Sequence, residues 1–249
     1  MRKFTILTIL IILGFAEVKS QDKITDHNNN IWFLVHGNYY LSEKFGLDSE
    51  AHLRLADMGG QKQQMLLRPS IYYKLTDQVR FYFGYTYINT YPYGTQPVAA
   101  RTPENNLWAQ ATINHNVGKL GLSHRYRLEK RWIGKLAPTA NGYEVQGRSQ
   151  KNRLRYRLTL KYTLPNQEKF YVAAFDEIFI NYGKDTRVNF FDQNWIYSGL
   201  GYNLSEGTSL ELAYQWQLIE KADGISEESN NTLVLSLHYN LPLGKNGKE

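Results

Sequence analysis

Arginines at alternate positions are the residues of this chain best suited to chemistry. They occur in two stretches, LGLSHRYRLEKRW and NRLRYRLTLKYTL, in which leucine and tyrosine fill most of the places between the charges. The arginines of these stretches are Arg125, Arg127, Arg131, Arg153, Arg155 and Arg157. A guanidinium group binds a carboxylate or phosphate through two parallel hydrogen bonds. Rows of such groups could therefore bind anionic solutes, as the charged rings of selective pores do.

Three histidines offer a second kind of chemistry. His36, His52 and His238 fall on the polar side of their segments, together with Ser236 and Glu50. A serine, histidine and acid set would suggest a hydrolase of envelope lipid, and three histidines could hold a metal ion. Hydrogen-bonded structural histidines are the simpler interpretation. We therefore assign no catalytic residue, metal or cofactor, and the sequence favours a role that is not enzymatic.

Strands must position these side chains, because the dominant period of the chain from Asn30 onward is two. A helix would scatter the arginines around its circumference and leave no apolar stripe. The eleven alternating segments cover residues 30–41, 47–56, 64–75, 79–91, 106–117, 120–132, 152–164, 170–181, 193–204, 209–220 and 232–241. Each is about ten residues long, which is the length that a tilted strand needs to cross a bilayer.

The N-terminus and the composition narrow the class of protein. Residues 1–20 have two basic residues, an apolar run and a polar end, in the order of a secretory signal peptide, so we expect a barrel domain over residues 21–249. The absence of cysteine excludes disulfides and thiolate metal sites. The formal charge of +6 is only mildly basic for 249 residues, and we expect no nucleic-acid partner.

The connections between the segments favour a transmembrane barrel. Short and long connections alternate, as periplasmic turns and extracellular loops do, and aromatic residues lie near the ends of the apolar faces. The sequence therefore predicts an all-β fold, a transmembrane antiparallel β-barrel of 10–12 strands. Twelve is the expected number, because bacterial single-chain barrels normally have an even count. A soluble periplasmic ligand-binding β-barrel is the alternative, because its strands would alternate in the same way.

In a membrane barrel the polar faces line the lumen. The basic residues expected there are Arg54, Arg68, Arg80, Arg125, Arg127, Arg131, Arg153, Arg155, Arg157 and Lys161. The acidic residues expected there are Asp48, Glu50, Glu129 and Glu177. Salt bridges among them would fill a narrow barrel and give it a structural role. Incomplete neutralisation would instead leave an arginine-lined channel for small anionic solutes, and the width of the barrel decides between the two.

Several motifs resemble domain of unknown function 2490, a family of outer-membrane barrels common in Bacteroidota. They are IWFLVHGNYYL, EAHLRL, SHRYRLEKRW, NRLRYRLTLKY, FDEIFIN and QNWIYSGLGYNL, and the likeness covers roughly residues 30–242. In the family an arginine often follows the Gln-Asn pair, and Trp195 stands at that place here. The resemblance implies a barrel in the outer membrane. We expect it to be a monomer in the cell outer membrane, in contact with outer-membrane lipid. The resemblance implies no reaction, so it adds no site residue.

Overall fold

Alternating polar and apolar residues form eleven long strands in the computed structural model, which describes residues 23–95, 97–183, 186 and 189–243. The strands are β1 (Ile24–Tyr40), β2 (Phe45–Ala56), β3 (Gln61–Lys74), β4 (Val79–Thr90), β5 (Thr102–Val117), β6 (Leu120–Thr139), β7 (Gly142–Thr163), β8 (Phe170–Tyr182), β9 (Phe191–Ser205), β10 (Thr208–Glu220) and β11 (Ser226–Pro242). A short 3-10 helix, η1 (Asp57–Gly59), lies between β2 and β3. The predicted signal peptide, residues 1–20, lies outside the described residues.

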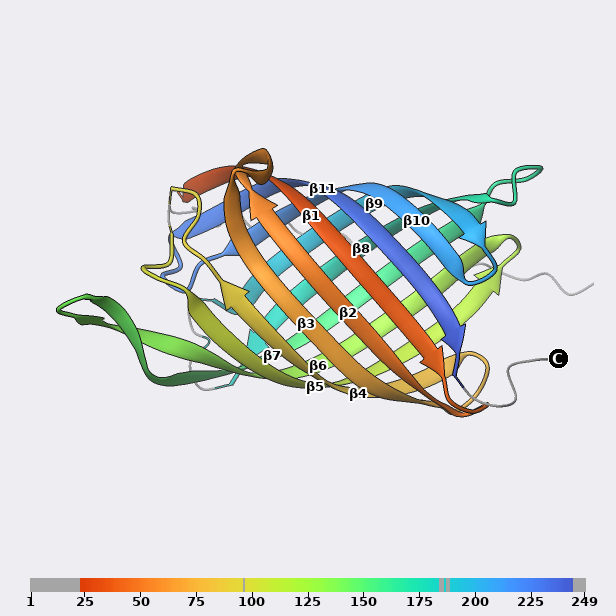
Figure 1. The fold of residues 1–249 in the computed structure, drawn as a ribbon, viewed down its shortest axis with the longest axis horizontal. Coiled ribbons are helices and arrows are strands. Elements are labelled where there is room, and N and C mark those ends of the chain that lie inside the picture. Colours follow the sequence, from red (N-terminus) through yellow and green to blue (C-terminus); the bar gives the residue numbers. More distant parts are fainter. Residues whose placement is uncertain (1–22, 96, 184–185, 187–188, 244–249) are drawn as a thin grey trace, which may run out of the picture.

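The strands close into one barrel in sequence order, and β1 pairs with β11 (Figure 1). Consecutive strands are antiparallel, but β1 and β11 are parallel from the pair Ile24 and Ser226 to the pair Tyr40 and Pro242. The all-β barrel and the range of 10–12 strands are confirmed. The expected count of twelve, and antiparallel pairing throughout, are wrong. In an odd-numbered up-and-down barrel the first and last strands run in the same direction, so only a parallel pair can close it.

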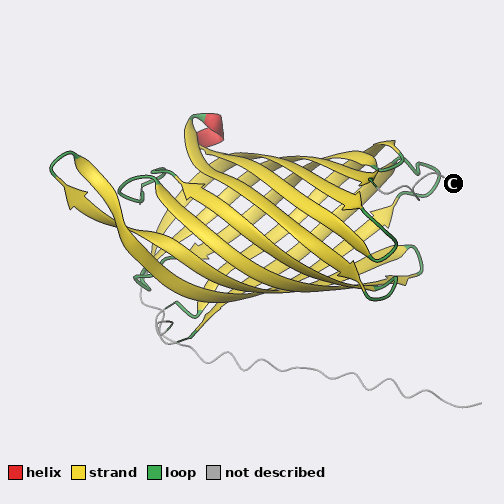
Figure 2. Ribbon diagram, turned by 60° about the horizontal axis from the view of Figure 1, so that its bottom comes forward, coloured by secondary structure: helices red, strands yellow, loops and turns green. Residues whose placement is uncertain are grey.

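The two ends of the barrel differ. At the end where β1 finishes, which we name the turn end, the connections are short and span residues 41–44, 75–78, 118–119, 164–169 and 206–207. At the opposite loop end the connections span residues 57–60, 91–101, 140–141, 183–190 and 221–225. The long loop predicted at residues 133–150 is instead mostly strand. There β6 and β7 continue far beyond the barrel wall as a projecting hairpin (Figure 2).

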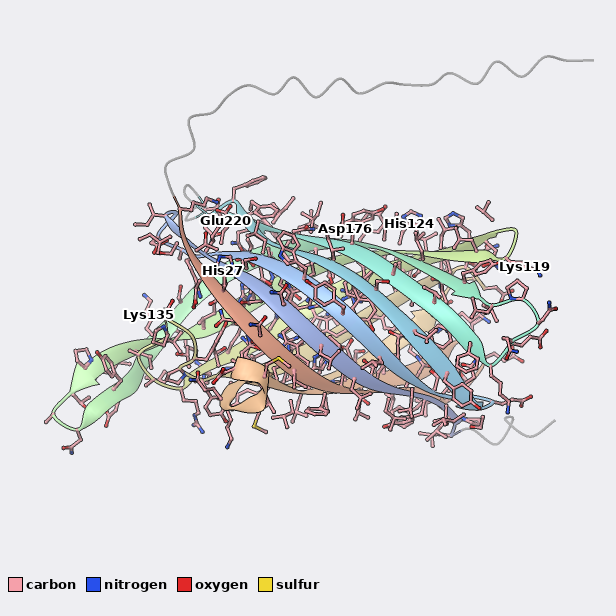
Figure 3. The ribbon with its side chains drawn as sticks, turned by 90° about the horizontal axis from the view of Figure 1, so that it is seen from above. His27, Lys119, His124, Lys135, Asp176 and Glu220 are labelled. Carbon is pink, nitrogen blue, oxygen red and sulfur yellow. The ribbon has the colours of Figure 1, made fainter. Side chains whose placement is uncertain are left out.

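The outer and inner faces of the wall have opposite chemistry. Outward side chains are mostly large and apolar, and Leu67 and Leu212 are 58% and 54% exposed. Inward side chains are mostly polar or charged and buried. Some polar residues also lie on the outer face, among them His124 and Asp176 (Figure 3). Within the described ranges, no helix is both long and apolar enough to cross a membrane.

Candidate functional site in the barrel lumen

A cluster of charged side chains occupies the middle of the lumen, where the sequence pattern predicted it. We call it the central charge cluster. Its members are Arg54, Arg68, Arg125, Arg127, Arg131, Arg153, Arg155, Arg157, Glu50, Glu104, Glu129, Glu177 and Asp192. Strands β2, β3, β5, β6, β7, β8 and β9 supply them. Because these residues alternate with outward apolar ones, each strand presents its charges to the same interior.

Glu177 is the carboxylate with the most arginine partners, and its side chain is 0% exposed. Its Oε1 atom accepts hydrogen bonds from Nη2 of Arg125 at 2.5 Å and from Nε of Arg155 at 2.8 Å. Its Oε2 atom accepts from Nε and Nη2 of Arg157 at 2.8 and 2.6 Å. One buried carboxylate on β8 therefore holds three arginines from β6 and β7, and it relieves the repulsion that neighbouring like charges would suffer.

Glu129 and Asp192 continue this network toward the loop end. Glu129 accepts from Nε of Arg153 at 2.7 Å and from Nη1 of Arg155 at 2.9 Å. Asp192 accepts from Nη1 of Arg153 at 2.8 Å. Alternating carboxylates and guanidinium groups thus form a continuous chain of ion pairs between β6, β7, β8 and β9.

Two members of the cluster were not predicted from the sequence. Glu104 binds Arg131 through two parallel hydrogen bonds of 2.7 and 2.8 Å, but it lay in the predicted loop 92–105. Continuing the alternation of Asn106 backward by two residues would have found it. Asp192 lay in the predicted loop 182–192, and the pairing of β8 with β9 is irregular near it, so alternation alone could not have placed it.

Glu50, on β2, is the carboxylate on the side of the cluster formed by β2 and β3. Its Oε2 atom accepts a hydrogen bond from Nη1 of Arg68 at 2.5 Å and lies 3.1 Å from Nε2 of His52. Arg68 also donates from Nε to Oγ1 of Thr86 at 3.0 Å. This side of the lumen therefore has one carboxylate in direct contact with one arginine and one histidine.

Arg54 and Arg127 have no carboxylate partner within 4.0 Å in the part of the chain that the structure describes. Arg54 donates to Oε1 of Gln64 at 2.7 Å and lies 3.3 Å from Nδ1 of His52. Arg127 donates from Nε to Oε1 of Gln110 at 2.8 Å. Nε of Arg54 and Nη1 of Arg127 are buried without any hydrogen-bond partner. These two guanidinium groups are therefore incompletely neutralised.

Aromatic rings partly replace the missing counterions. The guanidinium carbon of Arg54 lies 3.9 Å from the centre of the Trp32 ring, and that of Arg127 lies 4.1 Å from the Trp108 ring. Trp195 packs edge-on against Trp32 at 5.6 Å. Such cation–π contacts stabilise a buried guanidinium but leave its positive charge in place. Trp32, Trp108 and Trp195 thus line the lumen.

Two further basic residues of the predicted lumen set lie apart from the cluster, near the turn end. Arg80 lies over the ring of Tyr72 at 5.3 Å, and Lys161 lies over the ring of Tyr171 at 3.7 Å. No carboxylate pairs with either one among the described residues. Asp48 and Glu211 also lie inside this end of the lumen, so it holds charges of both signs.

The histidines form two separate groups. Nε2 of His36 lies 2.8 Å from Oδ2 of Asp48, and Nδ1 of His36 lies 3.5 Å from Nδ1 of His238. His52 belongs instead to the Glu50 side of the cluster. No hydrogen bond joins Ser236 to a histidine in the described chain, and no group of ligands there could hold a metal ion. The three histidines therefore do not form a single site.

The connection between β4 and β5 folds over the mouth at the loop end. The Tyr93 hydroxyl donates to Oε2 of Glu228 at 2.8 Å, and the Thr95 amide donates to Oδ2 of Asp26 at 2.9 Å. Burial and the Glu228 carboxylate raise the pKa of the Tyr93 phenol, so Tyr93 stays protonated and remains a hydrogen-bond donor. This connection is held to β1 and β11 and narrows the mouth.

Solved structures with similar folds are outer-membrane proteins of low sequence identity. The NanC porin is 12% identical over 83% of this chain and 90% of its own, with a TM-score of 0.49. Outer-membrane expressed OmpT of Vibrio cholerae is 12% identical over 80% of this chain and 60% of its own, with a TM-score of 0.39. The β-domain of the Bordetella autotransporter BrkA is 10% identical over 80% and 83%, with a TM-score of 0.41. These likenesses are too distant to carry an argument about function.

The sequence comparisons identify the family. A comparison with curated proteins found no match. The family described as "Protein of unknown function (DUF2490)" matches residues 29–228, which is most of the chain. The resemblance predicted from the motifs is therefore confirmed, and the chain belongs to the DUF2490 family.

Proposed function

We propose that this protein is a monomeric outer-membrane β-barrel whose lumen is closed to bulk solute, so that its role in the envelope is structural. The observation that carries the proposal is that the apolar side chains face outward and the charged side chains face inward. Large apolar side chains cover the outside, and arginine–carboxylate pairs fill the inside. A soluble barrel needs the opposite arrangement, because its apolar side chains must leave water. Hydrocarbon chains are the surroundings that suit this outer face.

The barrel meets the other demands of a membrane. Its strands are 12 to 22 residues long, more than the roughly 9–11 residues that a tilted strand needs to span the hydrocarbon. Closure between β1 and β11 pairs both edges of the sheet, so no open edge faces lipid. We place the turn end in the periplasm and the loop end outside the cell, because short periplasmic turns and long external loops are usual in such barrels.

The filled interior supports a closed lumen rather than a diffusion pore. Arg127 and Glu129 are each 2% exposed, although both point toward the barrel axis. At the loop end, Tyr93 adds a further obstruction by binding Glu228. Small barrels are commonly filled by their own side chains in this way.

A narrow conduit for small anions is the second candidate, and the charge count favours it. The central charge cluster holds eight arginines and five carboxylates, an excess of three positive charges. Arg80 and Lys161 are further basic groups toward the turn end, where Asp48 and Glu211 also lie. An anion that moved along this face would meet guanidinium groups at successive depths. By contrast, no hydrogen bond in the described chain joins a serine or threonine hydroxyl to His36, His52 or His238, so the geometry does not favour a lipid hydrolase.

Membrane extraction and conductance test these proposals. We expect the protein to require detergent for solubility and to migrate faster on gels when it is not boiled. Purification as a soluble protein without detergent would overturn the membrane assignment. In planar bilayers, a closed barrel gives no measurable conductance. A small, anion-selective conductance that loses its selectivity in Arg125→Ala/Arg155→Ala would establish the conduit instead. A large, unselective conductance would rule out both.

A further inference from the structure

The unpaired guanidinium groups inside the lumen point to a ligand. Arg54 and Arg127 are 6% and 2% exposed, and each has a buried N–H group with no acceptor. Every other arginine of the central charge cluster forms an ion pair with a carboxylate. Buried charges without a counterion are unfavourable, and buried N–H groups without an acceptor are rare.

Arg54 and Arg127 belong to the same part of the lumen. A series of contacts joins them: Arg54 contacts His52, His52 contacts Glu50, and Glu50 binds Arg68. Arg68 donates to Thr86, which also accepts from the Trp108 indole that lies against Arg127. Glu50 already accepts a hydrogen bond from Arg68 and contacts His52, so its negative charge is shared. Glu129, on the same face as Arg127, is already bound by Arg153 and Arg155, so neither carboxylate neutralises the two remaining guanidinium groups.

The surrounding side chains hold both arginines in fixed positions. Trp32 and Trp108 stack on their guanidinium planes, and Gln64 and Gln110 each accept one N–H group. A stacked guanidinium keeps its edge free for a planar or tetrahedral oxyanion. Water could satisfy an unpaired N–H group, but it would leave the excess positive charge in place.

We propose that the lumen binds a small oxyanion at Arg54 and Arg127, beside Arg68. Phosphate, sulfate and the carboxylate group of a small solute share the required chemistry, because each accepts two parallel hydrogen bonds from one guanidinium. This site goes beyond the proposed structural role, because it needs neither conductance nor a particular membrane. It also gives the buried excess of positive charge a counterion.

Binding of inorganic phosphate to the detergent-solubilised full chain tests the proposal. We expect calorimetry at constant ionic strength to show saturable binding of about one phosphate per barrel. Sulfate should compete, and chloride should not. Acetate distinguishes the sources, because competition by acetate would indicate a carboxylate solute and its failure an inorganic oxyanion. Absence of saturable binding for phosphate, sulfate and acetate would overturn the proposal.

Matched variants locate the site. Arg54→Gln and Arg127→Gln should each weaken binding at least about tenfold, which is the effect of losing one charge-assisted hydrogen bond. Lys130→Gln makes the same change of charge on the outer face and should leave binding unchanged. Unchanged binding in both arginine variants would refute the site.

A variant that should bind the anion more tightly provides a second test if an arginine variant does not fold. Glu50→Gln removes the competing carboxylate and should tighten binding. Unchanged or weaker binding in a folded Glu50→Gln protein would count against the site. Because all binding is measured in detergent, these results are independent of the conductance experiments.

Discussion

Replacement of Glu177 by glutamine should greatly destabilise the barrel. The amide is nearly isosteric with the carboxylate, so the substitution removes charge without opening a cavity. Glu177 is the only carboxylate in the described structure that pairs with Arg125 or Arg157, whereas Arg155 keeps Glu129. Removing one partner of a buried ion pair costs about 3–5 kcal/mol, because the other charge is left uncompensated. Because both Arg125 and Arg157 would be left without a carboxylate, we expect the loss of unfolding free energy to lie at or above the upper part of that range.

Urea unfolding in phospholipid vesicles, followed by tryptophan fluorescence, would measure this loss. Glu168→Gln is the matched control, because Glu168 lies exposed in the short connection between β7 and β8. Arg157→Gln should cost less than Glu177→Gln, since it leaves Glu177 with two arginines. A Glu177→Gln barrel whose free energy of unfolding lies within about 0.5 kcal/mol of the unmodified protein would refute the view that this carboxylate holds the lumen together.

Three other substitutions test the packing and the sidedness of the wall in the same unfolding assay. Gly84→Ala should destabilise the barrel by about 1–3 kcal/mol, because the new Cβ would overlap the Trp108 ring, whereas Gly121→Ala meets no atom closer than 3.4 Å and should be tolerated. Leu212→Arg should cost about 2–4 kcal/mol in vesicles if this outer face meets hydrocarbon, and an unchanged stability would contradict that placement. Asp176→Leu should stabilise the barrel by about 1 kcal/mol, because it removes a carboxylate from the apolar face, and a loss of stability would show that the hydrogen bond from Asn194 outweighs the cost of that carboxylate.

The sequence predicted eleven alternating segments and the inward side of most of the charged residues, because both follow from one local property. Along a strand, successive side chains point to opposite faces, so the alternation of Arg153, Arg155 and Arg157 with apolar residues already fixes their direction. The same pattern predicts that His36 and Asp48 face the interior, where Nε2 of His36 lies 2.8 Å from Oδ2 of Asp48.

The partners within the lumen could not be predicted in the same way. Which carboxylate pairs with which guanidinium depends on the register between strands and on distances across the lumen. The sequence of one strand determines neither. The shared role of Glu177 is one example, because it combines arginines of β6 and β7. The projecting hairpin was missed because Gly134, Pro138 and Gly142 are typical of loops. The strand number was missed because it depends on how the two ends of the sheet meet.

The parallel contact between β1 and β11 also constrains how the molecule assembles. Hydrogen-bonded side chains such as Asn28 and Asn230 are 202 positions apart, whereas every other neighbouring pair of strands is joined by a nearby connection. Hairpins can form as soon as their two strands exist, but this last junction requires the whole sheet to have curled first. Until then, β1 and β11 present open edges that could pair with foreign strands. A newly made copy is therefore most vulnerable to aggregation just before the cylinder is completed.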